Sequence, residues 1–98
     1  MELTANKNGA DLTVSVNGEV NTMTAPELSA LLDKELPGVQ TLTLDFANCD
    51  YVSSAGLRVL LYTYKQMKAA GGSMNLANVD DGIMDVLHNT GLDSVFGL

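Results

Sequence analysis

Alternating hydrophobic and polar residues mark the β-strands of this chain. In Leu12–Val16 every second residue is hydrophobic, with Thr13 and Ser15 between them, which is typical of a strand with one buried face. Val39–Phe46 predicts a second strand of this kind, because Leu42, Leu44 and Phe46 alternate in it with polar residues. A shorter stretch, Ser73–Asn78, predicts a third. We therefore expect these three strands to share one sheet.

The first residues of the chain predict an edge strand. Glu2–Asn6 is mostly polar and precedes a turn at Lys7-Asn8-Gly9. A turn of this kind favours a hairpin, so we expect Glu2–Asn6 to pair antiparallel with the strand that follows. Because this segment has few hydrophobic residues, we place it at the edge of the sheet.

A leucine stripe predicts the first helix. Thr24-Ala25-Pro26-Glu27 has the residues of a capping box, in which the Thr24 hydroxyl accepts a hydrogen bond from the Glu27 amide and the Glu27 side chain reaches back. Pro37-Gly38 ends the helical pattern. The helix therefore lays one hydrophobic face on the sheet. The leucines at helical spacing are Leu28, Leu31, Leu32 and Leu36.

The same spacing predicts two more helices. One begins at Ser54 and ends at Gly71-Gly72; Asp80 or Asp81 caps the other, which Gly91 ends. After it, we expect an extended segment. That segment is Ser94-Val95-Phe96. In both helices we expect the apolar residues at helical spacing to face the core. They are Leu57, Leu60, Leu61, Tyr64 and Met67 in the longer helix and Ile83, Val86 and Leu87 in the last one.

The order of these elements, β-β-α-β-α-β-α, predicts the α/β class. We expect residues 1–98 to form a single domain with a mixed, mostly parallel sheet of about four strands and three helices, because right-handed crossovers join successive parallel strands. The loops that leave parallel strands meet at one edge of the sheet, where α/β domains place their sites. These loops are Gly18–Met23, Ala47–Ser53 and Asn78–Asp81.

Composition and charge narrow the possible partners. The 98 residues are 46% hydrophobic and have a net charge of −7, so the average field repels nucleic acid and anionic lipid. No apolar run is long enough to cross a bilayer, and in the sequence the basic residues do not gather beside an apolar face. We therefore expect no direct nucleic-acid binding and no membrane insertion. One cysteine, Cys49, and no signal-peptide pattern favour a cytoplasmic protein.

The segment Tyr51–Leu57 carries the most unusual local chemistry. Its two serines, Ser53 and Ser54, stand at the start of a leucine-rich helix. One interpretation is an N-cap, for which serine is favoured. The other is a modification site, because a helix start tolerates a phosphate that adds nearly two negative charges. The pattern alone leaves both open.

Catalytic, metal and cofactor sites are not predicted. The single histidine, His88, falls near the end of the last helix, far from Ser54 in the predicted order, so a Ser-His-Asp triad is disfavoured. One cysteine and one histidine cannot form a zinc site, and Asp80-Asp81 is better explained as a helix cap than as a magnesium site. The glycines form no phosphate-binding loop.

The segment LDFANCDYVSSAGLRVLLYTYKQMKAAGGSMNL resembles the strand, phosphorylation loop and helix of bacterial anti-sigma-factor antagonists, in the STAS domain family. NGEVNTMTAPEL resembles the second loop and first helix of that family, and VLHNTGLDSVF its last helix. The resemblance thus covers most of the chain in the family's order. It implies a STAS fold and a regulator of transcription with no catalysis of its own.

The resemblance also implies a phosphorylated serine. Ser54 takes the position of the family's acceptor, two residues before Gly56, and Ser53 is the alternative. This chain departs from the common pattern by having Ser53 where Asp is frequent and Ala55 where a second hydroxyl is frequent. The residues expected to contact partners at this edge are Asn21, Thr22, Met23, Asp45, Asp50, Ser53 and Gly56.

What the family resemblance implies for partners is a switching cycle. The unphosphorylated protein binds a serine kinase that is also the anti-sigma factor, with an ATP-binding fold like that of histidine kinases, and releases its client sigma factor. A metal-dependent serine phosphatase resets the cycle. The alternative is a STAS-type scaffold or sensor module that binds a protein or small ligand without phosphorylation, for which Ser53 in place of Asp is the sign.

Overall fold

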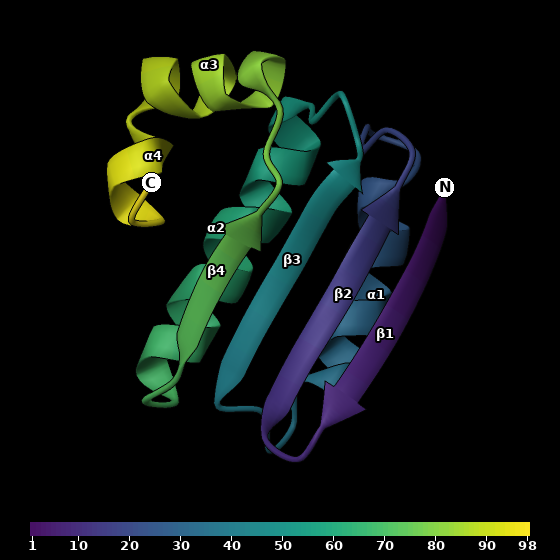
Figure 1. Cartoon of the computed structure of the whole chain (residues 1–98), viewed down its shortest axis with the longest axis vertical. Helices are drawn as coiled ribbons and strands as arrows, with labels where there is room; N and C mark the ends of the chain where they lie inside the picture. Colours follow the sequence, from purple (N-terminus) through teal and green to yellow (C-terminus); the bar gives the residue numbers. More distant parts are fainter.

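The computed structural model describes all residues, 1–98, and has four strands and four helices in the order ββαβαβαα. Figure 1 shows the strands side by side as one twisted sheet, with the two longer helices behind it. The strands are β1 (Glu2–Asn8), β2 (Asp11–Asn17), β3 (Thr41–Asn48) and β4 (Ser73–Ala77). The helices are α1 (Ala25–Glu35), α2 (Ser54–Ala69), α3 (Asp81–Thr90) and α4 (Leu92–Val95).

The sheet has the predicted mixed topology. Its strand order is β1-β2-β3-β4, with β1 antiparallel to β2 and the other neighbours parallel. Strand β1 is the exposed edge strand that its polar sequence predicts: only Leu3 in it is half-buried. Strand β3 begins two residues later than expected, because Val39 lies in a turn closed by its amide on the Leu36 carbonyl.

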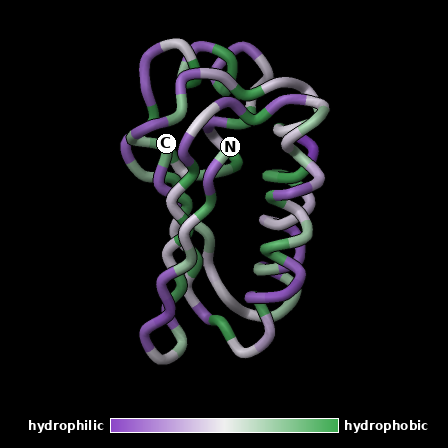
Figure 2. Tube along the Cα trace, turned by 90° about the vertical axis from the view of Figure 1, so that its right-hand side faces the viewer, coloured by the Kyte–Doolittle hydropathy of each residue, from purple (hydrophilic) through white to green (hydrophobic).

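The hydrophobic residues of the strands and helices form one core between two layers. Figure 2, turned by 90° from Figure 1, shows the sheet and a helix on opposite sides of the molecule. Alternate residues of β2 and β3 are buried, and Leu28 and Leu32 of α1 are buried on top of them, with Leu31 and Leu36 partly buried at the margin. The period-two and helical patterns therefore meet in one core, as predicted.

Helix α2 buries a different stripe from the one that its leucines predict. The fully buried positions are Gly56, Leu60, Thr63 and Met67. Leu61, which we expected inward, is only half-buried. The Thr63 hydroxyl donates to the Val59 carbonyl at 2.7 Å, so this buried polar group is satisfied within the helix.

The C-terminal residues correct two further expectations. Ser94-Val95-Phe96 is not extended: Leu92–Val95 forms the short helix α4. Gly91 has φ 76° in the left-handed region, which ends α3 and lets the chain begin a new turn at once. Phe96 is then buried, with its ring edge-on to Tyr64 at 5.6 Å.

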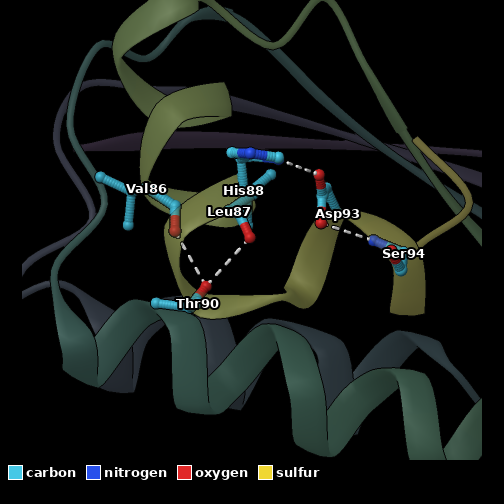
Figure 3. A network of polar contacts seen from close by, with 6 residues as sticks. All are labelled: Val86, Leu87, His88, Thr90, Asp93 and Ser94. Carbon is cyan, nitrogen blue, oxygen red and sulfur yellow. Dashed lines mark hydrogen bonds and ion pairs between the residues drawn. The ribbon is translucent and has the colours of Figure 1, made fainter.

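Helices α3 and α4 are joined by a small polar network (Figure 3). His88 Nδ1 and Asp93 Oδ2 lie 2.9 Å apart, and the Thr90 hydroxyl donates to the carbonyls of Val86 and Leu87. Ile83 and Leu87 are buried as expected, but Val86 is not inward: it is exposed on the flank of α3. Asp80 caps α3 by accepting a hydrogen bond from the Ile83 amide.

Candidate functional site

Three loops meet where β2, β3 and β4 end, and we call them the loop edge: residues 18–24, 47–53 and 78–80. Backbone hydrogen bonds join the first two loops. The Gly18 amide donates to the Asn48 carbonyl and the Val20 amide to the Tyr51 carbonyl, both at 2.9 Å, and the Ser53 amide donates to the Val20 carbonyl at 2.8 Å. A parallel bridge also pairs Val20 with Val52. The loop edge is therefore an extension of the sheet with a fixed shape.

The first loop is held by Asn21 and Thr24 in place of the expected capping box. Asn21 Oδ1 accepts from the amides of Met23 and Thr24 at 2.9 and 3.0 Å. The Thr24 hydroxyl accepts from the Asn21 amide and donates to the Glu19 carbonyl at 2.7 Å. Thr24 still stands at the N-cap of α1, but its hydroxyl caps no helix amide, so that prediction is wrong. The hydroxyl instead closes the loop.

Asp45 connects the ends of β3 and β4. Its Oδ1 accepts from the Asn78 side-chain amide and from the Ala47 backbone amide, each at 3.0 Å. The Asn78 hydrogen bond, and then that of Ala47, lowers the pKa of the Asp45 carboxyl below its ordinary value. Asn78 has φ 55°, a left-handed conformation that asparagine tolerates best after glycine. The sequence analysis placed Asn78 at the end of a predicted strand and not among the site residues, whereas β4 ends at Ala77 and Asn78 is the first residue after it.

The two serines at the start of α2 have different surroundings. Ser53 is the N-cap: it is half-buried, its backbone is extended, and its hydroxyl accepts from the Gly56 amide at 3.3 Å. Ser54 is the first residue of the helix and is exposed. The cap interpretation thus applies to Ser53, while Ser54 presents its side chain to solvent beside the free amides of a 16-residue helix.

Gly56 allows α2 to begin directly against the loop edge. It is buried, and a Cβ at this position would lie 2.7 Å from methyl groups of both Val20 and Val52. Those two valines are the bridged residues of the joined loops. The absence of a side chain at Gly56 therefore sets how closely Ser54 approaches the loops.

The surface of the loop edge combines exposed hydrophobic side chains with carboxylates. Met23 is 82% exposed and Tyr51 is 50% exposed, which is the kind of surface that protein interfaces use. Thr22 and Asp50 are exposed beside them, and Asn21 is half-buried. Tyr51 was not among the predicted contact residues, although the sequence analysis singled out the segment Tyr51–Leu57 for its serines.

Cys49 and His88, the residues considered for metal binding and catalysis, lie in separate parts of the structure. No group of three or more histidine, cysteine, aspartate or glutamate side chains could hold a metal ion. Cys49 is buried, burial raises the pKa of its thiol, and its Sγ lies 3.4 Å from the Tyr51 carbonyl. His88 pairs with Asp93 near the C-terminus. Ser54, the first residue of α2, presents an exposed hydroxyl next to the loop edge.

The outer face of α2 contradicts our expectation that the basic residues do not gather beside an apolar face. Arg58 and Lys65 do lie beside an apolar surface, since they line a groove with Leu61 and Tyr62. Helical spacing folds together residues that look scattered in the sequence. None of the helices, however, is long and apolar enough to span a membrane.

Fold and site together define a small α/β domain with a mixed four-stranded sheet and an exposed serine where a helix leaves the loop edge. The family model of the STAS domain matches residues 2–98. The chain belongs to the STAS domain family, which confirms the resemblance found in the sequence.

Relatives in this family are anti-sigma factor antagonists. BtrV of Bordetella bronchiseptica, a candidate anti-sigma factor antagonist, is 34% identical over 97 residues, which cover 98% of this chain and 84% of BtrV. The anti-sigma-B factor antagonist of Bacillus subtilis is 28% identical over 92 residues, 94% of this chain and 84% of that protein. An anti-sigma factor antagonist from Mycobacterium paratuberculosis has a TM-score of 0.85 and 25% identity, covering 97% of this chain and 81% of that one.

Proposed function

We propose that this protein is an anti-sigma-factor antagonist whose binding is controlled by phosphorylation of Ser54. Unphosphorylated, it binds through the loop edge to a serine kinase that is also an anti-sigma factor, and the client sigma factor is released. The kinase, with an ATP-binding fold like that of histidine kinases, supplies ATP, metal and catalytic base. A metal-dependent serine phosphatase restores the unmodified form.

The observation that carries this proposal is the contrast between the two serines. Ser54 is exposed at the first position of α2, whereas the Ser53 hydroxyl is occupied as the helix cap. A kinase can therefore reach Ser54 without opening the helix start. To modify Ser53, a kinase would instead have to reach a half-buried hydroxyl that accepts a hydrogen bond from the Gly56 amide.

Charge explains how the phosphate would change binding. The loop edge already carries Glu19, Asp50 and Asp80, with Asp45 beside it in β3, and no basic residue stands in its three loops. A phosphate adds about 1.5–2 negative charges at neutral pH. The helix start favours this charge locally by about 0.3–1 kcal/mol, so the fold remains intact while an acidic partner surface is repelled.

The test begins with the full chain, an extract of the source cells and ATP, followed by intact mass and fragmentation. We expect one phosphate on Ser54, none on Ser54→Ala, and an unchanged amount on the control Ser53→Ala. A phosphate on Ser53 would overturn the residue assignment. No phosphate, in an extract that modifies a control substrate, would favour the alternative, a scaffold or sensor module that binds without phosphorylation.

The kinase identified in this way then supplies the binding test. We expect the unphosphorylated protein and Ser54→Ala to bind it, and Ser54→Asp to bind at least about tenfold more weakly, because the added charge faces the partner. Equal affinity of Ser54→Asp and the parent protein would contradict an electrostatic switch.

A further inference from the structure

Helix α2 has a charge opposite to that of the rest of the molecule. It contains no aspartate or glutamate and carries three of the five basic residues, in a chain of net charge −7. The three are Arg58, Lys65 and Lys68, and all are exposed. The remaining residues hold only two lysines against twelve acidic side chains. The outer face of α2 is therefore a basic strip on an acidic protein.

Two residues of this strip, Arg58 and Lys65, line a groove between α1 and α2, whereas Lys68 Nζ lies 5.9 Å from the centre of the Tyr64 ring. The groove has a volume of about 430 Å³, and its floor includes Val59 and Leu61, with Ser29 on the α1 side. Tyr62 is 57% exposed within it. The Tyr62 hydroxyl accepts a hydrogen bond from the Gln66 side chain at 3.2 Å, so the ring is held with its apolar surface open to solvent.

The basic residues on the rim have no partner inside the molecule. Its ion pairs are Lys7 with Glu35 and His88 with Asp93, neither of which involves the groove. Arg58, Tyr62 and Lys65 follow each other at spacings of four and three, so they form one stripe of about 10 Å along the helix. Two unpaired cations thus flank one exposed aromatic ring.

We propose that this groove docks an acidic segment of a partner protein. Carboxylates of that segment pair with Arg58 and Lys65, and one of its apolar side chains packs against Tyr62. Arginine and tyrosine are the residues that interface centres favour. Charge complementarity selects the occupant: the groove attracts carboxylates that the rest of this acidic surface repels. Pairing of two copies through the same groove would bring like charges together.

A protein segment fits this face better than a membrane. An anionic bilayer would be attracted by the basic strip but repelled by the rest of the chain, which holds all twelve acidic side chains. The groove is also separate from the loop edge, and none of its lining residues belongs to the three loops. The inference therefore goes beyond the proposed switch and does not require that Ser54 be phosphorylated.

The test uses the full chain labelled with ¹⁵N and two synthetic 14-residue amphipathic peptides. One has leucines flanked by glutamates; in the other each glutamate is replaced by lysine. We expect the glutamate peptide to shift the amide signals of Ser29 and residues 58–65, and the lysine peptide to leave them unchanged. Arg58→Glu should weaken the binding of the glutamate peptide at least about tenfold, and Tyr62→Ala should weaken it several-fold.

The matched control is Lys34→Glu, which makes the same charge change at an exposed lysine of α1 outside the groove. We expect it to keep the parent affinity, and circular dichroism checks that every variant is folded. Equal weakening by Lys34→Glu, or no shift at residues 58–65 with millimolar glutamate peptide, would overturn the proposal. So would Arg58-dependent binding to phosphatidylserine vesicles, or a dimer in sedimentation that Arg58→Glu dissolves.

Discussion

The loop edge and the outer face of α2 differ in both charge and construction. The loop edge is acidic, and backbone hydrogen bonds between neighbouring loops fix its shape. The α2 face is basic, and one helix with an exposed tyrosine forms most of it. Small domains have little room for an enclosed pocket. This one instead presents two surfaces of opposite charge, which favour different partners.

The two surfaces share a helix. Ser54 and Arg58 are four residues apart on α2, so their side chains lie on the same face, one turn from each other. A phosphate on Ser54 would therefore add charge to the loop edge and also approach the first cation of the basic strip. The comparison can be sharpened by variants that alter one surface and leave the other intact.

The largest effect is expected at Gly56, where α2 meets the joined loops. In Gly56→Val, the new side chain overlaps the methyl groups of Val20 and Val52, which lie 2.7 Å from a Cβ at this position. We expect a loss of about 3 kcal/mol in the free energy of unfolding, measured by urea denaturation. The melting temperature should fall by more than about 10 °C.

Gly82→Val is the matched control for this change. Gly82 also lies in a helix, but a Cβ there meets only the Asp80 carboxylate oxygen, at 3.6 Å. We expect stability within about 0.5 kcal/mol of the parent. If both glycine variants lost the same stability, close packing of α2 on the loop edge would not explain the result at Gly56.

The next effect concerns the hydroxyl that closes the first loop. Thr24→Val keeps the side-chain shape but leaves the Asn21 amide and the Glu19 carbonyl without their partner. We expect a loss of about 1–2 kcal/mol, whereas the exposed Thr22→Val should change stability by less than about 0.5 kcal/mol. Amide hydrogen exchange at Asn21 measures the loop directly. Unchanged protection there would contradict the assigned role of Thr24.

The sequence predicted what depends on local pattern. Alternation in β2 and β3, the leucines of α1, the Asp80 cap and the Gly91 stop all follow from residues close together in the chain, and the structure confirms them. The class of fold and the position of Ser54 at a helix start followed from the order of the predicted strands and helices along the chain.

The errors occurred where the folded arrangement offers a side chain contacts that residue spacing alone does not show. Thr24 fits a capping box by spacing, but its hydroxyl forms hydrogen bonds with Glu19 and Asn21 instead. Leucine spacing put Leu61 inward, yet α2 turns the stripe with Gly56, Leu60, Thr63 and Met67 to the core, and at its start only a residue without a side chain fits against Val20 and Val52. Tertiary contact can override a local hydrophobic pattern in this way.

A smaller effect separates the two serines. Ser53→Ala removes the hydroxyl that caps the Gly56 amide at 3.3 Å, and we expect a loss of about 0.5–1 kcal/mol. Ser54→Ala removes only an exposed side chain and should change stability by less than about 0.5 kcal/mol. Thermal unfolding of both variants under one condition gives the comparison. The reverse order would mean that Ser54, and not Ser53, caps the helix.

The smallest effect is a change of acidity at the loop edge. Asn78→Ala removes the hydrogen bond that contributes most to the lowered pKa of Asp45, so we expect this pKa to rise toward the ordinary aspartate value near about 4. Carboxyl ¹³C titration by NMR measures this pKa.

Because the folded pKa is depressed, the Asp45 carboxylate stabilises the fold above its unfolded pKa, and this contribution disappears as pH falls through the folded value. In Asn78→Ala the contribution should be smaller, and its loss should be complete at a higher pH. Asp93 provides the control: its own pKa is lowered by His88, far along the chain, and should not move. An unchanged pKa of Asp45 would show that the Ala47 amide alone holds its charge, and that β3 and β4 are tied at the loop edge by their backbones only.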